Sequence, residues 1–117
     1  MTDKRRKSER VRASIPIEWG VTEEYPRQGK IVSLSAEGCL VRTQIEPLYG
    51  KTILLRFLLT KEPQQLLQGE ASWMSLQGEV IYYLRDVGFA MRFAGMSDEA
   101  QQTIEELVSF YREHPVS

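Results

Sequence analysis

The amino-acid sequence predicts a mainly β protein, a small antiparallel β-barrel of six or seven short strands followed by one C-terminal α-helix. Three observations lead to this prediction. Short runs of alternating apolar and polar residues, typical of strands with one buried face, recur along the chain. Glycine, proline and serine residues separate these runs at short intervals. From Ser97 onward, the apolar residues recur at helical spacing instead.

The first predicted strand spans residues 15–21, with Ile17 and Trp19 among its buried positions. Pro16 has no backbone N–H, so this strand is expected to lie at an edge or to be unpaired at its start. Residues 22–28 are polar and are expected to form a loop.

A second strand is predicted at residues 29–32, and an extended segment resumes at residues 39–43. Between them, two serines and a glycine in residues 33–38 indicate a tight connection. The later elements follow from the same alternation of strand and turn signals. In order, they are a turn at residues 47–50, a strong strand at 51–60, a loop at 61–65, a strand at 67–74, a hairpin turn at 75–78, and paired strands at 79–84 and 87–93 joined at Arg85 and Asp86.

The last predicted element is an amphipathic helix. Ser97 is a suitable N-cap, and Asp98 and Glu99 place negative charge in the first turn, where the helix dipole favours it. The helix is expected to end before Pro115. Its predicted apolar stripe consists of Ala100, Ile104, Leu107, Val108 and Tyr111.

The chain has 117 residues, which suits one domain with one core. We expect residues 1–12 to form a flexible basic arm and residues 13–113 to form the barrel and helix. No apolar run approaches the roughly 18 residues that span a bilayer, and no apolar stretch follows the basic N-terminus as in a secretory signal. A cytoplasmic protein without membrane insertion is therefore expected.

Cys39 is the only cysteine and His114 the only histidine. A single cysteine excludes an internal disulfide and fits a reducing compartment. A zinc site or a Cys/His catalytic pair is not expected, and no glycine-rich phosphate loop precedes a helix, so the sequence predicts a protein that is not an enzyme. Cys39 is predicted to be a buried apolar residue, and Trp19 and Trp73 are predicted to lie in the core or at a barrel end.

The first twelve residues carry six basic and two acidic side chains, whereas the whole chain has a net charge of −1. Three of the basic residues are Arg5, Arg6 and Arg10. A guanidinium group presents donors in a planar fork that matches phosphate oxygens or the Hoogsteen edge of guanine. The arm is compatible with an anionic partner, although by itself it is more typical of a solvated tail.

Two short motifs change this interpretation. An RxxxR motif, extended to RRxxxR, precedes the first strand, and an SxSxxG motif lies between the next two strands. The residues of these motifs are Arg5, Arg6, Arg10, Ser33, Ser35 and Gly38. Their order and spacing, with the closing strand and helix, resemble the signature of the PilZ domain family, bacterial receptors for cyclic diguanylate (cyclic di-GMP). The resemblance extends from about residue 5 to about residue 112 and implies a PilZ-like split barrel.

The resemblance also implies a role for each motif residue. Arg6 and Arg10 would contact phosphate and guanine acceptors, and Arg5 would be a stacking or charge partner. Ser35 would form a hydrogen bond in the loop. Gly38 would allow a close backbone approach or a left-handed conformation.

The sequence departs from the family pattern at Ser33, where the family has Asp or Asn. Serine is shorter and offers one hydroxyl in place of carboxylate or amide oxygens. The exchange of a charge-assisted hydrogen bond for a neutral one is expected to cost about 1–2 kcal/mol, or roughly five- to thirty-fold in affinity. The arginine contacts would remain, so Ser33 predicts weaker binding rather than its loss.

The sequence thus predicts a cytoplasmic receptor that converts binding of cyclic di-GMP into a changed interaction with an effector protein, in control of motility, pili or biofilm. The alternative is a divergent adaptor of the same fold that does not bind the nucleotide. Binding to DNA or RNA is not expected, because only one short segment is strongly basic. The sequence indicates no metal and no further cofactor.

Overall fold

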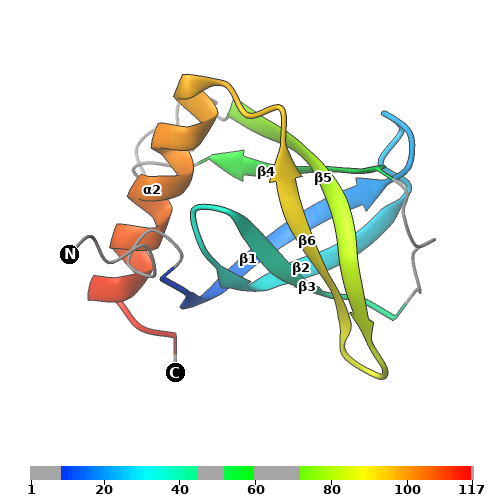
Figure 1. Ribbon diagram of the computed structural model, residues 1–117, viewed down its shortest axis with the longest axis horizontal. Helices are drawn as coiled ribbons and strands as arrows, with labels where there is room; N and C mark the ends of the chain where they lie inside the picture. The colour runs from blue at the N-terminus through cyan, green and yellow to red at the C-terminus, as the bar shows by residue number, and fades with distance from the viewer. Residues whose placement is uncertain (1–8, 45–51, 60–71, 117) are drawn as a thin grey trace.

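The computed structural model describes residues 9–44, 52–59 and 72–116 (Figure 1). Within this part of the chain, six antiparallel strands close into a barrel in the order β1-β2-β3-β6-β5-β4, and a helix lies across one end (Figure 1). The elements are β1 (Val11–Gly20), β2 (Arg27–Leu34), β3 (Gly38–Arg42), β4 (Thr52–Leu59), β5 (Ser72–Leu84), β6 (Gly88–Ala94) and α2 (Asp98–Glu113). The predicted mainly β barrel with a C-terminal helix is therefore confirmed, with six strands.

The barrel interior is filled by the side chains that alternate along each strand. Trp19 is 1% exposed, and its ring meets that of Phe89 edge to face, with 5.0 Å between centroids. Trp73 behaves differently, because it is half exposed on the outside of β5, where the guanidinium of Arg56 lies 4.4 Å from its ring centroid. The core prediction is therefore confirmed for Trp19, whereas Trp73 is not a core residue.

Helix α2 follows the sequence prediction closely. The hydroxyl of Ser97 accepts a hydrogen bond from the backbone N–H of Ala100 at 3.1 Å, which caps the first turn. Ala100, Ile104 and Val108 are buried against the barrel. The apolar stripe thus attaches the helix to the barrel, as predicted.

One predicted turn is wrong. Residues 75–78 do not form a hairpin turn but lie in the middle of β5, a continuous strand of 13 residues. Gly78 pairs with Phe93 on β6, and a Cβ atom at Gly78 would lie 2.2 Å from the carbonyl oxygen of Arg92. The glycine thus marks a close approach of two backbones within the sheet. In the sequence alone, a glycine at such a position is equally compatible with a turn. Leu76, expected in the turn, is buried.

Other boundaries shift by a few residues. Strand β1 begins at Val11 and ends at Gly20, so it enters the expected arm and leaves Val21 57% exposed in a loop. The predicted turn at Arg85 and Asp86 is confirmed, with the N–H of Val87 donating to the carbonyl of Leu84 at 3.0 Å. The predicted turn at residues 47–50 and loop at 61–65 lie outside the described residues, as do both ends of the predicted strand at 51–60.

The two edges of β1 differ. One edge pairs with β2 over most of its length, from Val11 opposite Leu34 to Trp19 opposite Arg27. On the other edge, the described pairing with β4 covers three residue pairs, which join residues 18–20 to residues 54–56. The expectation of an edge strand is wrong, because the barrel is closed and β1 pairs with both β2 and β4. Pro16 is tolerated because the described pairing with β4 does not extend to it.

Helix α2 is also attached to the start of β1. The hydroxyl of Tyr111 donates to the carbonyl of Ser14 at 3.4 Å, and Arg112 forms an ion pair with Glu9 at 2.5 Å. These contacts connect the last turn of the helix to the residues that precede the first strand.

Candidate functional site

The turn between β2 and β3 is built by Ser35. Its hydroxyl oxygen accepts hydrogen bonds from the backbone N–H groups of Glu37 (3.3 Å) and Gly38 (3.2 Å). Its own backbone N–H donates to the carbonyl of Gly38 at 2.9 Å. Ser35 is 5% exposed, so the turn is held by a buried hydroxyl that mimics a backbone acceptor.

Gly38 is required by a close approach to β6. It pairs with Arg92, and a Cβ atom at this position would lie 2.2 Å from the carbonyl oxygen of Met91. The backbone carbonyl of the preceding residue, Glu37, accepts a hydrogen bond from the N–H of Phe93 at 2.9 Å. Of the two expected roles for Gly38, the structure supports close backbone approach, since Gly38 does not have a positive φ.

Ser33 lies at an irregularity in β2. Ile31 pairs with Val41, but Ser33 pairs with Leu40, so one extra residue, Val32, bulges from β2. On its other side, Ser33 lies opposite Arg12 of β1. Ser33 is therefore half-buried in the sheet beside an arginine, rather than free in a loop.

Three exposed arginines surround this turn. Arg12 is paired with Ser33, and Arg92 is paired with Gly38. Arg10 directly precedes Val11, which lies opposite Leu34, so continuation of this register places Arg10 beside Ser35. The chain thus brings cations from β1 and from β6 to the two sides of one turn.

The buried thiol of Cys39 provides a second sign that Arg10 is close. Burial raises the pKa of this thiol from 9.0 to about 12, while the positive charge of Arg10 acts in the opposite direction. Cys39 is 2% exposed between its partners Leu34 and Met91. The thiol therefore remains protonated near neutral pH, which confirms that Cys39 is a buried apolar residue.

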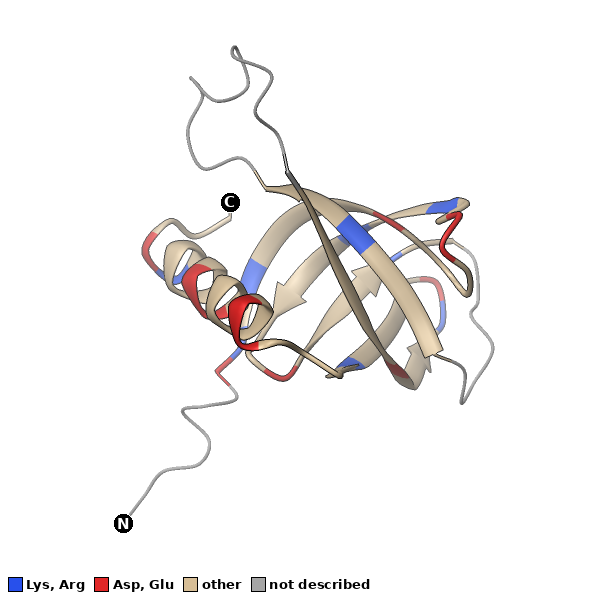
Figure 2. Cartoon of the chain, turned by 90° about the horizontal axis from the view of Figure 1, so that it is seen from above, with Lys and Arg blue, Asp and Glu red and all other residues tan. Residues whose placement is uncertain are grey.

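Charges are segregated over the surface (Figure 2). Acidic residues follow one another along α2, which carries five acidic residues and one basic residue. The outer face of β1, β2, β3 and β6 instead presents exposed cations. In the described part of the chain the exposed cations of these strands are Arg12, Arg27, Lys30, Arg42 and Arg92, and Arg10 directly precedes β1. The turn thus lies in a basic environment although the whole chain is slightly acidic.

A comparison with protein-family models matches residues 4–110 to the PilZ domain. This match covers the barrel, the turn and most of α2. The chain belongs to the PilZ domain family. This family comprises receptors and adaptors for cyclic di-GMP, so the resemblance expected from the two motifs is confirmed.

Two solved structures share the fold of this PilZ domain. The PilZ domain of CeSA from a cellulose-synthesizing bacterium has a TM-score of 0.63 and 17% identity, over 90% of this chain and 99% of that one. The Bacillus subtilis inhibitor of motility (MotI/DgrA) has a TM-score of 0.71 and 14% identity, over 98% of this chain and 55% of that one. Our chain thus spans about half the length of the motility inhibitor. No curated protein matches the sequence.

The structure brings together four of the six predicted site residues. Ser33, Ser35 and Gly38 lie at the β2–β3 turn and Arg10 directly precedes Val11, which pairs with Leu34 beside that turn, whereas Arg5 and Arg6 lie outside the described residues. Neither Arg12 nor Arg92 belonged to the predicted set of site residues. Strand alternation could have indicated both, because each is a charged residue between two buried neighbours.

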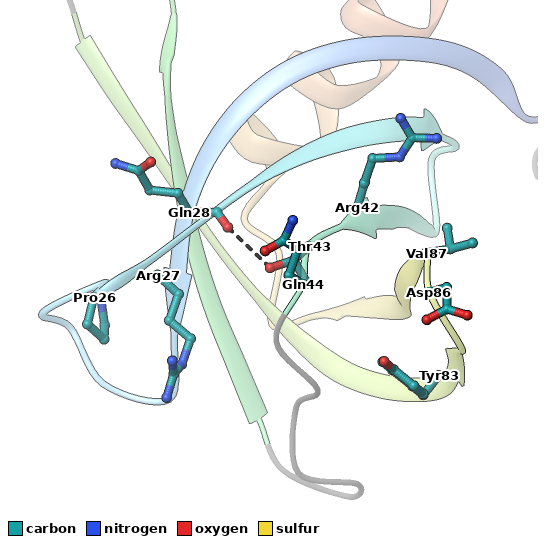
Figure 3. Close-up of a pocket in the computed structure, with 9 residues that line it drawn as sticks. All are labelled: Pro26, Arg27, Gln28, Arg42, Thr43, Gln44, Tyr83, Asp86 and Val87. Atoms are coloured by element: carbon teal, nitrogen blue, oxygen red, sulfur yellow. Dashed lines mark hydrogen bonds between the residues drawn. The ribbon is translucent and has the colours of Figure 1, made fainter.

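A pocket in the described part of this PilZ domain lies elsewhere (Figure 3). It has a volume of about 770 Å³ and lies at the far end of β3, where Arg42 pairs with Gly88. Its lining includes Arg27, Arg42 and Asp86, but the two arginine side chains project in opposite directions (Figure 3). The pocket contains none of the predicted site residues and presents no convergent set of cations.

Within the described residues, no cluster of histidine, cysteine, aspartate or glutamate has the arrangement of a metal site. The described helix is too short and too polar to cross a membrane.

Proposed function

We propose that this PilZ domain binds cyclic di-GMP at the β2–β3 turn and acts as an adaptor, without catalysing a reaction, in the cytoplasm. The observation that carries the proposal is the strand register, in which Arg12 lies opposite Ser33, Arg92 lies opposite Gly38, and Arg10 directly precedes Val11, the partner of Leu34. A ligand with two phosphates and two guanines requires several cations close together. Membership in a family of cyclic di-GMP receptors supports this ligand over other anions.

Each side of the turn would make a different contribution. Arg10 and Arg12 extend from β1 and would contact phosphate oxygens or guanine acceptors, together with Arg5 and Arg6 from the preceding segment. Arg92 would add positive charge from β6. Ser35 and Gly38 hold the turn in shape, so their main contribution would be to position the backbone that faces the ligand.

A ligand on Arg10 would also affect α2. Glu9, the neighbour of Arg10 in sequence, pairs with Arg112 on the helix, and both side chains are about half exposed. Such ion pairs contribute at most about 1 kcal/mol, so a ligand that displaces the arm could break this one readily. Binding at the turn would then change how the helix is presented to an effector protein.

The alternative function is an adaptor of the same fold that does not bind the nucleotide. Ser33 favours it, because the short hydroxyl is half-buried in the sheet where the family places a carboxylate or amide. The effector would then bind this protein constitutively.

Calorimetric titration with cyclic di-GMP distinguishes the two functions. We expect saturable binding to the wild-type chain and a roughly ten- to hundred-fold loss for Arg10→Ala, because a charge-assisted hydrogen bond contributes about 1.5–3 kcal/mol. The matched control is Arg85→Ala, at the exposed β5–β6 turn, which should bind as the wild type does. Absence of binding to the wild-type chain would support the alternative adaptor function.

A further inference from the structure

A groove opens on the edge of β1 that faces β4. Two adjoining hollows of about 500 and 360 Å³ share Ile15, Pro16 and Leu58 in their lining. The larger hollow lies between β1, β4 and α2, and the smaller one continues along β1 to Trp73 on β5. We call this continuous depression the β1–β4 groove.

The groove is apolar and open to solvent. Leu58 is 46% exposed, Trp73 is 50% exposed and Phe110 on α2 is 51% exposed. Large apolar side chains that gather around a hollow, rather than lying singly on the surface, mark a site of contact with another molecule. The groove therefore has the composition of a docking surface.

The backbone in the groove indicates how a partner would bind. Among the described residues, β1 and β4 pair only where residues 18–20 lie opposite residues 54–56. Beyond that point both strands continue without further described pairing to each other, β1 back to Val11 and β4 on to Leu59. On β1 the carbonyl of Ser14 accepts from Tyr111 and Pro16 has no N–H, so the backbone open to a partner in the described structure is that of residues 57–59 of β4. Unpaired edges of this kind can accept an extended peptide as an added strand.

The charged residues that line the groove indicate which charge a partner would carry. The described lining includes two acidic residues, Glu18 and Glu106, and no lysine or arginine. Glu18 is neutralised by Arg56 at 2.7 Å, whereas Glu106 is exposed on α2, whose other acidic residues extend the negative surface. A partner that covers this groove therefore gains from positive charge on the side that faces α2, whereas Arg56 already lies over Trp73 at the other end.

We propose that the β1–β4 groove binds an extended segment of a partner protein in which apolar residues alternate with lysine or arginine. The alternation follows from strand geometry, which directs one set of side chains toward Leu58, Trp73 and Phe110 and leaves the other beside the acidic helix. This inference identifies the effector surface of the adaptor proposed above, but binding in the groove does not require the nucleotide.

The test uses a fluorescein-labelled peptide of alternating lysine and valine with a central phenylalanine, with anisotropy measured on the full chain without nucleotide. We expect saturable binding at low ionic strength. Two control peptides should bind much more weakly, one with glutamate in place of lysine and one with serine in place of the apolar residues. Equal binding of the glutamate peptide, or no binding of the lysine peptide, would overturn the proposal.

Variants locate the peptide. We expect Leu58→Ser to weaken binding roughly five- to twenty-fold and Glu106→Lys about three-fold, because each side chain is exposed and lines the groove. The matched controls are Val21→Ser and Glu24→Lys, both exposed in the β1–β2 loop, which should not change the affinity. Phe110→Ser is a second apolar variant in case Leu58→Ser unfolds. Equal affinities for all variants would place the peptide elsewhere and refute the groove.

Two further experimental outcomes would separate the groove proposal from a dimer interface and from the proposed nucleotide function. If sedimentation shows a dimer that Leu58→Ser dissociates, the groove is covered by a second copy of this chain and the proposed partner is wrong. If the peptide binds as expected but cyclic di-GMP does not bind, the docking surface stands and only the proposed nucleotide function fails.

Discussion

The two edges of β1 differ in how far they are paired and in the charge of the surface beside them. Along the β2 edge, a nearly continuous ladder leads to a tight turn, where a buried hydroxyl and a close backbone contact fix the geometry. Along the β4 edge, the described ladder is short and an open apolar groove begins. The first region is rich in arginine, whereas the second borders an acidic helix.

This difference matches the two binding sites proposed above, one for cyclic di-GMP at the turn and one for a peptide in the groove. A rigid, cationic turn suits a small anionic ligand, because preorganised donors lose little freedom on binding. An open edge suits a peptide, which supplies its own backbone hydrogen bonds. Both regions meet at the start of β1, where Glu9 and Ser14 contact α2.

The largest effect is expected from a substitution that disrupts the β2–β3 turn. Gly38→Ala would place a Cβ atom 2.2 Å from the carbonyl oxygen of Met91, which rigid backbone cannot relieve. We expect the free energy of unfolding to fall by about 3 kcal/mol, measured by urea denaturation. The control, Ala94→Ser, adds one heavy atom at an exposed position of β6 and should change stability little. Equal stability of both variants would show that the turn is not tightly packed against β6.

A smaller effect, on the affinity for cyclic di-GMP, is expected from a substitution of Ser33. Ser33→Asp introduces the carboxylate of the family pattern beside Arg12, and we expect cyclic di-GMP to bind roughly five- to thirty-fold more tightly, or about 1–2 kcal/mol. Affinity for the basic peptide in the β1–β4 groove should not change. Ser75→Asp, at an exposed position of β5, serves as the charge control. A similar gain for both variants would attribute the effect to general charge rather than to position 33.

The smallest effect concerns the thiol behind the turn. Because burial raises the pKa of Cys39 from 9.0 to about 12, the folded chain keeps a proton that the unfolded chain loses above pH 9. Stability linked to this group is therefore complete below pH 9 and declines as the pH rises toward 12. At pH 10 the loss is about 1.4 kcal/mol.

Urea denaturation of the wild-type chain and Cys39→Ala at pH 7 and pH 10 isolates this contribution. The wild-type chain should lose about 1.4 kcal/mol more than the variant between the two pH values. The same loss in both proteins would mean that other groups, such as tyrosines, cause the pH dependence.

Local patterns predicted much of the fold. The helix was predicted from Ser97 and its apolar stripe, since capping and helical spacing are properties of neighbouring residues. The pattern failed at Gly78, because a glycine between strand-like runs is compatible with a turn or with a close approach inside one strand. Only the pairing with β6 decides between them.

The candidate site was predicted in part for the same reason. The motifs identified Arg10 and the turn residues, because family patterns record residues that are close in sequence. Arg92 is distant in sequence from Gly38 and becomes its neighbour only through the β3–β6 ladder. The β1–β4 groove likewise depends on where two strands separate, which no local pattern in the sequence records.

The central claim is that cyclic di-GMP binds between the arginines of β1 and β6 at the β2–β3 turn. The most direct test is a titration followed by amide NMR chemical shifts on the full chain. We expect the largest shift changes at Arg10, Arg92 and residues 33–38. Largest changes at residues 42–44 and at Asp86, around the pocket at the far end of β3, would contradict the claim.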